Sequence, residues 1–325
     1  MIIRSRSRRT NIITVYVMAV VILFVGRQLF LPASEPAENT LIFISDFDSV
    51  DASRNANSVY RVSIDGRVMR RIVGSIPHGD GYLRATDIDC EPVSQQLVIA
   101  SHRRDLNGFH HSLLDGTGLH LDKPAAGDLL SATRQIAIAP DGAAIVVSRQ
   151  FEGFAEPRFG LVAGALFSRK FRIIRSPTAD QSFISPDFSA SGRQLVYIIK
   201  RHDDDASWAS RLVVANSAGR KEQVIYETRR QISEVAWSPT GEWLALVVDR
   251  QVYRMNPYGG AELAKLTDHP GGATSPRWSP DGAQISYVTA STFPGHHLLM
   301  IMNADGSAKR RVTNVWGAVT NGCWV

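Results

Sequence analysis

Histidine and aspartate side chains gather in the longer polar segments of this 325-residue sequence. One such segment holds His202, Asp203, Asp204 and Asp205, and another holds His296 and His297. Imidazole and carboxylate groups are ligands for metal ions and the usual groups of acid–base catalysis. However, these clusters share no recognised ligand spacing, and surface loops favour both residue types for turn formation and solvation. We therefore predict no metal and no cofactor.

Aromatic and basic residues occur in the same set of segments, where they would serve as anchors for a protein or peptide partner. One aromatic residue alone would more often pack against its own loop, so this prediction depends on several loops contributing together. The predicted binding residues are, in chain order, His102, Arg103, Arg104, Phe154, Arg201, His202, Asp203, Asp204, Asp205, Trp208, Phe293, His296 and His297.

The motifs of several enzyme classes are absent from the sequence. It has no Gly-x-Ser-x-Gly nucleophile elbow, no GxGxxG segment and no Walker loop. The net charge of +5 is concentrated at one end, because five arginines against two glutamates in residues 1–38 contribute +3 of it. The nearly neutral remainder does not indicate nucleic-acid binding. We predict a non-enzymatic binding protein; the alternative is a ligand sensor, hydrolase or lyase that uses histidine and aspartate.

A repeated pattern of sequence positions these loops. The segment SPRWSPDGAQISYV at residues 275–288 contains an aromatic residue, a Pro-Asp-Gly turn and a short apolar run, and similar segments recur along the chain. Spacings of 48, 50, 49, 41 and 46 residues separate the aromatic position of successive repeats, which falls on Cys90, Ile138, Phe188, Trp237, Trp278 and Trp324. A period of about 40–50 residues is typical of the blades of a β-propeller.

A second pattern completes each repeat: a strand, a tight turn rich in Asp, Asn and Gly, and a further strand, as in VYRVSIDGRVMRRI from Val59. The third repeat, RFGLVAGALFSRKFRII, lacks the Asp-Gly pair, so its turn is the least certain. Each repeat therefore supplies four strands. The second of them is apolar on both faces, as a blade between two others requires.

The two ends of the repeat array complement each other. TLIFIS at residues 40–45 resembles a second strand without a first, and TNGCWV at residues 320–325 resembles a first strand without a second. Pairing of these segments would close the ring and remove its exposed edges. We therefore predict an all-β, six-bladed propeller with short turns on one face. The long loops would lie on the opposite face, where we expect binding.

The two cysteines, Cys90 and Cys323, fall on the first strands of adjacent blades. An extracytoplasmic location would permit a disulfide between them. Cys90 takes the aromatic position of its repeat whereas Cys323 takes the position before it, and such an offset turns two side chains to opposite faces of a strand. We therefore expect free, buried thiols.

The N-terminal segment favours a membrane anchor. Residues 1–11 form a basic tail, residues 12–31 an apolar span interrupted by Arg27, and residues 32–39 a polar linker. The span reaches the roughly 20 residues that a transmembrane helix needs, and the flanking arginines predict a cytoplasmic N-terminus. A cleaved signal peptide and a buried helix of a soluble domain are the alternatives. The anchor reading places the propeller, residues 40–325, outside the cytoplasm.

The repeated W-S-P-D-G turns, each followed by an N-A-D-G hairpin, resemble the TolB-type β-propeller, whose repeats are related to WD repeats. The resemblance covers about residues 40–325 and is closest at residues 276–313. It implies the propeller fold and, together with the anchor, a bacterial inner membrane protein with a periplasmic propeller. It says little about function, because propellers host scaffolds, lyases, hydrolases and sensors. We expect a protein or peptide partner in the cell envelope.

Overall fold

In a computed structural model, the chain divides into two units, residues 1–38 and 39–325. The structure describes residues 40–46, 57–73, 77–78, 81–82, 85–91, 95–101, 108–122, 133–166, 170–202, 209–260, 262–293, 295–313 and 319–325. The predicted tail, anchor and linker lie outside these residues. No helix within the described ranges is long and apolar enough to cross a membrane.

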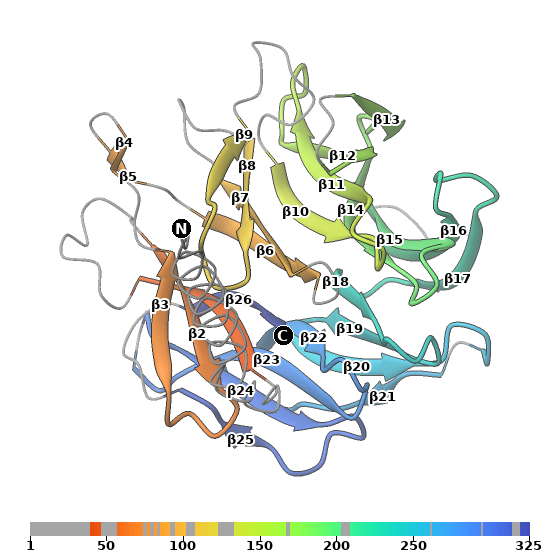
Figure 1. The fold of residues 1–325 in the computed structure, drawn as a ribbon. Coiled ribbons are helices and arrows are strands. Elements are labelled where there is room, and N and C mark those ends of the chain that lie inside the picture. Colours follow the sequence, from red (N-terminus) through yellow and green to blue (C-terminus); the bar gives the residue numbers. More distant parts are fainter. Residues whose placement is uncertain are drawn as a thin grey trace, which may run out of the picture. The chain divides into compact units, whose positions relative to one another are not determined.

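The second unit is a ring of six four-stranded antiparallel sheets (Figure 1). From the innermost strand outward, blade 1 comprises β26 (Val319–Trp324), β1 (Thr40–Ser45), β2 (Ser58–Ser63) and β3 (Met69–Val73). Blade 2 comprises β6 (Ala85–Glu91), β7 (Gln96–Ser101), β8 (Gly108–Leu113) and β9 (His120–Asp122). Blade 3 comprises β10 (Thr133–Ile138), β11 (Ala144–Phe151), β12 (Arg158–Ala165) and β13 (Phe171–Arg175). Blade 4 comprises β14 (Gln181–Phe188), β15 (Gln194–Arg201), β16 (Ser210–Asn216) and β17 (Gln223–Thr228). Blade 5 comprises β18 (Ile232–Trp237), β19 (Leu244–Val248), β20 (Gln251–Met255) and β21 (Ala264–Lys265). Blade 6 comprises β22 (Ala273–Trp278), β23 (Gln284–Ala290), β24 (His297–Asn303) and β25 (Arg310–Arg311). A small hairpin of β4 (Pro77–His78) and β5 (Gly81–Tyr82) follows blade 1 in the chain.

The prediction of six blades closed by the two ends of the chain is confirmed. The strand β26 pairs antiparallel with β1, and the main chains of Thr40 and Val325 exchange two hydrogen bonds of 3.0 and 2.9 Å. The innermost strands contact one another around the axis in the order of the blades. The innermost sheet edge therefore lines a closed channel, which leaves no gap between the first and last blades.

The hydrophobic core lies between the blades, in layers that each join two neighbours. Alternate residues of one buried strand serve opposite layers: Leu41 and Phe43 of β1 pack with blade 6, whereas Ile42 and Ile44 pack with blade 2. Side chains point to alternate faces along a strand, so a strand between two sheets must be apolar at every position. This is why the second strand of each repeat reads as a continuous apolar run.

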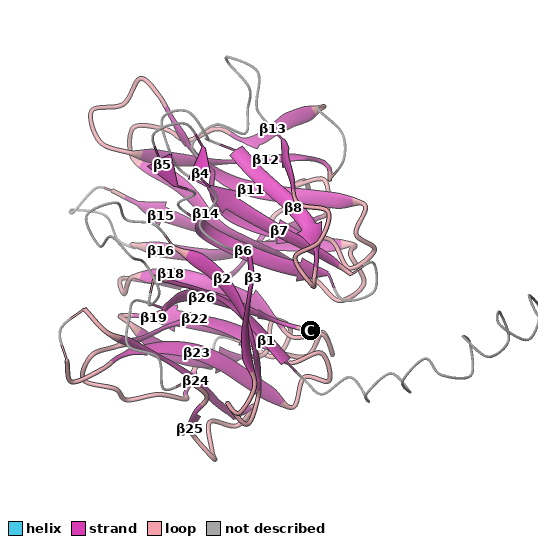
Figure 2. Ribbon diagram, turned by 60° about the vertical axis from the view of Figure 1, so that its left-hand side comes forward, coloured by secondary structure: helices cyan, strands magenta, loops and turns pink. Residues whose placement is uncertain are grey.

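Short turns connect the third strand of a blade to the fourth and, in blades 2 to 6, the first strand to the second. Because the sheets are antiparallel, these turns share one face (Figure 2). In blade 6, the Ser279 hydroxyl donates to Asp281 Oδ1 at 2.6 Å, and Gly282 adopts φ +71°. In blade 2, Gly116 has φ +85°, and a Cβ there would collide with the carbonyl oxygen of Ile72 in blade 1. Glycine thus serves both the turn and the close approach of the next blade.

The expectation of free thiols is wrong, because Cys90 and Cys323 form a disulfide with a Cα–Cα distance of 5.8 Å. The offset of one residue does turn the two side chains to opposite faces of their own sheets. Neighbouring blades, however, stack face to face, so the forward face of blade 1 meets the backward face of blade 2. Opposite faces are therefore what a bond between two blades requires.

We predict that this disulfide stabilises the ring closure, because it joins residues 233 positions apart in the sequence. The double variant Cys90→Ser/Cys323→Ser should lose about 2–4 kcal/mol of unfolding free energy in urea titrations. A reductant should lower the stability of the wild type to the same value and leave the variant unchanged. Equal midpoints for the two proteins under oxidising conditions would contradict the prediction.

Candidate binding site at the channel mouth

A belt of polar side chains links each blade to the next around the channel. Each member lies three residues before the aromatic position of its repeat, and each bonds to the neighbouring blade. The members of this interblade belt are Asp87, Gln135, Ser185, Glu234, Ser275 and Asn321.

The belt bonds run from side chain to main chain in five of the six interfaces. Asp87 Oδ2 accepts from the Ile136 N–H at 2.8 Å, and Glu234 Oε2 accepts from the Ser275 N–H at 2.8 Å. In the remaining interface, between blades 1 and 2, the Asn321 amide donates to Asp87 Oδ1. The belt therefore satisfies main-chain groups of the innermost strands, whose free edges face the channel.

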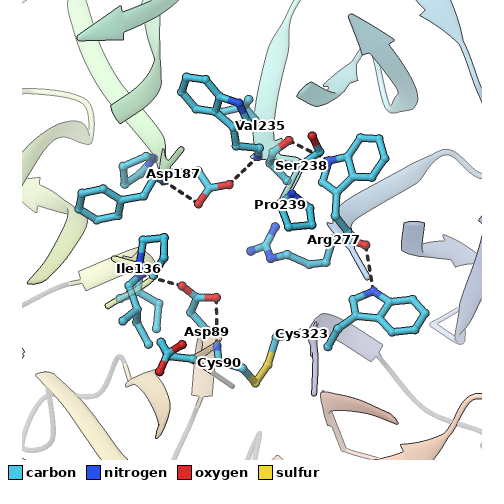
Figure 3. A pocket seen from close by; sticks show the side chains of 18 of the residues that line it. Asp89, Cys90, Ile136, Asp187, Val235, Ser238, Pro239, Arg277 and Cys323 are labelled. Carbon is cyan, nitrogen blue, oxygen red and sulfur yellow. Dashed lines mark hydrogen bonds between the residues drawn. A yellow bond between two sulfur atoms is a disulfide. The ribbon is translucent and has the colours of Figure 1, made fainter. Parts of the chain in front are cut away.

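A cavity of about 400 Å³ lies in the channel beside the belt (Figure 3). Its walls include Pro140, Pro239 and Pro280, which belong to the short turns that follow the innermost strands. The cavity therefore opens at the short-turn face. Aromatic side chains line the same walls, among them Phe188, Trp237, Trp278 and Trp324.

Asp89 and Asp187 point into this cavity from blades 2 and 4. Each carboxylate accepts two main-chain bonds. Asp187 Oδ2 accepts from the Trp237 N–H at 2.6 Å and its Oδ1 from the Phe188 N–H at 2.8 Å. Asp89 is bonded in the same manner, with the Ile138 N–H at 2.7 Å and the Cys90 N–H at 3.0 Å. Because a carboxylate offers about four acceptor sites, both groups can accept further donors from a ligand.

Arg277 is the single basic side chain among the described residues that line the cavity, which also include Asp87, Asp89, Asp187 and Glu234. It extends toward the side of the cavity where Asp89 and Asp187 lie (Figure 3), and one guanidinium nitrogen is 3.8 Å from Asp87 Oδ1. The carboxylates that line the cavity therefore outnumber its single described cation. Burial opposes the charge of Arg277, yet these carboxylates together raise its pKa above the usual value.

The buried carboxyl groups that line the cavity have raised pKa values. Burial raises the pKa of Asp87 to about 7, of Asp89 to about 6 and of Asp187 to about 7, although Arg277 acts to lower each of them. Burial also raises the pKa of Glu234. A ligand that brings positive charge into the cavity would lower these pKa values and stabilise the ionised carboxylates.

The predicted binding residues that the structure describes lie elsewhere, on the long-loop face. Phe154 follows β11 in blade 3. Arg201 ends β15 in blade 4, and His202 follows it. In blade 6, Phe293 and His296 lie between β23 and β24, and His297 begins β24. His202 lines a second cavity of about 210 Å³, and Phe293 is 54% exposed. His102, Arg103, Arg104, Asp203, Asp204, Asp205 and Trp208 lie outside the described residues. The long-loop face thus stays a prediction.

Sequence reasoning overlooked the belt and the acidic groups beside it. A signal was present: the residue three positions before the aromatic position is polar in every repeat, although the residue that follows it is always non-polar. Polar and apolar residues also alternate along ordinary strands, so this pattern alone does not indicate a bond between blades. Within the described residues, no group of three or more His, Cys, Asp or Glu side chains is arranged to hold a metal ion.

We predict that the acidic cluster makes the folded protein less stable as the pH rises. A carboxyl group whose pKa is raised by folding contributes stability below its unfolded pKa of about 3.9, and loses it as the pH passes its folded value. For Asp187 this window runs from about pH 4 to about pH 7. Asp187→Asn removes the charge and keeps an acceptor for the Trp237 N–H, but it gives up the acceptor for the Phe188 N–H. From pH 4 to pH 8, the unfolding free energy of the variant relative to that of the wild type should therefore rise by about 4 kcal/mol.

Asp281→Asn in the short turn of blade 6 is the matched control with the opposite sign. The hydrogen bond from Ser279 holds the pKa of Asp281 below its usual value, so this variant should be less stable than the wild type at pH 8. That deficit should shrink as the pH falls through the lowered pKa. Urea titrations of all three proteins across the pH range test both signs. A stability gap for Asp187→Asn that does not change with pH would argue against the prediction.

Comparison with known proteins finds a similar family for the second half of the chain. Residues 168–325 match the family described as the TolB beta propeller domain. A stretch of 127 residues is 31% identical to the "Uncharacterized peptidase YuxL" of Bacillus subtilis (strain 168), and this match covers 37% of the chain and 19% of that protein.

Solved structures show the same fold. TolB from Acinetobacter baumannii superposes with a TM-score of 0.65 at 15% identity, over 88% of this chain and 66% of that one. A putative TolB from Agrobacterium tumefaciens gives a TM-score of 0.62 at 16% identity, over 86% and 90%. A chain of the nidogen/laminin complex gives 0.65 at 9% identity, over 88% and 98%. At such identities the likeness concerns the fold alone. Residues 168–325 thus resemble the TolB beta propeller domain, and the described part of the chain forms a propeller of six blades.

Proposed function

We propose that this protein is a non-enzymatic binding scaffold whose channel mouth, on the short-turn face, receives a segment of a partner protein that carries a lysine or arginine side chain. The observation behind the proposal is the excess of carboxylates over Arg277 in an open cavity of about 400 Å³. Asp89 and Asp187 have acceptor sites to spare, which an ammonium or guanidinium group can fill.

The walls of the cavity suit a peptide. Indole and proline surfaces lie beside the carboxylates, so the methylene stem of a basic side chain can pack on apolar groups while its charged end meets Asp89 or Asp187. Concave sites with apolar walls and a few converging polar groups are typical of binding pockets. Rigid strands hold the carboxylates, which keeps the cost of ordering them low.

In this proposal the partner and the propeller both lie in the cell envelope. The apolar segment 12–31 anchors the chain in the inner membrane with its basic N-terminus in the cytoplasm. The Cys90–Cys323 disulfide supports an oxidising compartment for the propeller, as the periplasm is. The long-loop face, with the exposed Phe293, is the other docking surface that the sequence suggests.

A second candidate function is an enzyme or ligand sensor at the same channel mouth. Aspartate pKa values of about 6 to 7 lie in the range that general acid–base catalysis uses at neutral pH. The described residues that line the cavity include aspartates but no histidine, so a site of this kind would use carboxylates alone. Turnover of a substrate that Asp187→Asn abolishes would favour this candidate over the scaffold.

Photocrosslinking in native membranes distinguishes docking at the channel mouth from docking at the long-loop face. We place a photoreactive residue at Ala190, which is exposed at the channel mouth, at Phe293 on the long-loop face, and at Val224 on the outer strand β17 as the control. A discrete adduct at Ala190, lost in the variant Asp89→Asn/Asp187→Asn, is the expected result. An adduct at Phe293 alone would move the docking site to the long-loop face.

A peptide that spans the crosslinked segment then tests the chemistry. Its affinity for the full chain should fall at least about tenfold when its basic residue is replaced by glutamine, because a charge-assisted hydrogen bond is lost. Binding should also weaken as the pH falls through about 7 to about 6, because Asp87 and Asp187 take up protons near pH 7 and Asp89 near pH 6. Affinity that is independent of both changes would exclude recognition of a cation by these groups.

A further inference from the structure

A second cavity, of about 210 Å³, lies at the opposite end of the innermost strands from the channel mouth. Arg134 near the start of β10, Ser182 near the start of β14 and Ser233 near the start of β18 line it, so it opens toward the long-loop face of blades 3 to 5. Lys200 and His202, at the end of β15, complete the basic part of the lining. Gln135 and Glu234 of the interblade belt line both cavities and so lie between them.

The basic groups of this cavity are held in place by neighbours. The Arg134 guanidinium lies 5.1 Å from the centre of the Phe159 ring, a cation–π arrangement that limits its rotamers. The Phe159 N–H donates to Ser182 Oγ at 3.1 Å, and His202 Nε2 lies 2.9 Å from the same hydroxyl. The His202 N–H donates to the carbonyl of Asp180 at 2.8 Å. Strand ends from two blades therefore fix the positions of Arg134 and His202.

The balance of charge around the cavity is positive. Arg134 and Lys200 face it together with one carboxylate, Glu234, which already accepts from the Ser275 N–H. The nearby Asp180 carboxylate lies 3.9 Å from Arg201, so it is compensated by its own cation. Burial lowers the pKa of His202, and the charges of Arg158 and Lys200 lower it further, as expected in a positive environment.

We propose that this cavity binds the carboxylate group of a small organic acid, with Arg134 and Lys200 as its cationic partners and the hydroxyls of Ser182 and Ser233 as further donors. Guanidinium and ammonium groups beside hydroxyls form the charge-assisted bonds that carboxylates accept. The volume admits a compact acid of a few carbon atoms. The C-terminal carboxylate of a peptide carries the same group, so the test includes both sources.

Calorimetric titration of the full chain with succinate, at low chloride concentration, tests the proposal. Arg134→Gln and Lys200→Gln each remove one charge and keep a donor, and each should weaken succinate binding at least about tenfold. Glu234→Gln should strengthen binding, because it removes the competing carboxylate and keeps an acceptor for the Ser275 N–H. The matched control is Arg172→Gln on the exposed strand β13, which should bind as the wild type does.

A second arm compares the tripeptide Ala-Ala-Ala with its C-terminal amide. Binding of succinate identifies a free acid as the ligand, and binding of the free tripeptide but not of its amide or succinate identifies a chain terminus; either supports the carboxylate site. No heat from any of these probes up to about 10 mM would overturn the proposal, as would an equal loss in Arg172→Gln. Thermal midpoints of the variants, measured in parallel, separate lost binding from lost folding. Arg134→Gln and Lys200→Gln provide independent readings of the same site.

Discussion

Six polar side chains at one position of the repeat hold the ring together around its axis. Each belongs to an innermost strand, and each bonds to the next blade, from Asp87 through to Asn321, which returns to Asp87. An innermost strand has one edge without a partner in its own sheet. Its main-chain groups would be left unsatisfied in the narrow channel, at a cost of about 1–3 kcal/mol for each buried group. The belt removes that cost and sets the register between neighbouring blades.

The same arrangement creates the chemistry of the channel. Carboxylates are good acceptors for main-chain N–H groups, so Asp87, Asp89, Asp187 and Glu234 suit the bonds between blades. Gathered around one axis, however, their charges face a single arginine, and burial raises their pKa values. The channel mouth is therefore a place where the folded protein carries unfavourable charge that a cationic ligand would relieve. Such local destabilisation is common where a structure is prepared for binding.

One geometric rule explains several features that look unrelated in the sequence. Alternate residues of an innermost strand face the preceding and the following blade. Trp278 and Trp324 therefore donate their indole N–H groups to the preceding blade, to the carbonyls of Ala236 and Arg277. Asp89 and Asp187, one residue before the aromatic position, accept from the following blade. The disulfide obeys the same rule, since Cys90 faces backward and Cys323 faces forward.

The architecture was readable from the sequence because a propeller repeats one local pattern. Each repeat carries its own turn residues, and each second strand is apolar at every position, so number, order and closure of the blades follow from local spacing. The pairing of the first and second strands agrees with the repeat pattern: Trp237 pairs with Leu244, Trp278 with Ile285 and Trp324 with Leu41. The disulfide, the cavity and the acidic cluster depend instead on contacts between residues about 50 or more than 200 positions apart. Only the tertiary structure could decide them, because the sequence records which face of its own sheet a side chain takes, whereas the stacking of blades determines which side chains then meet.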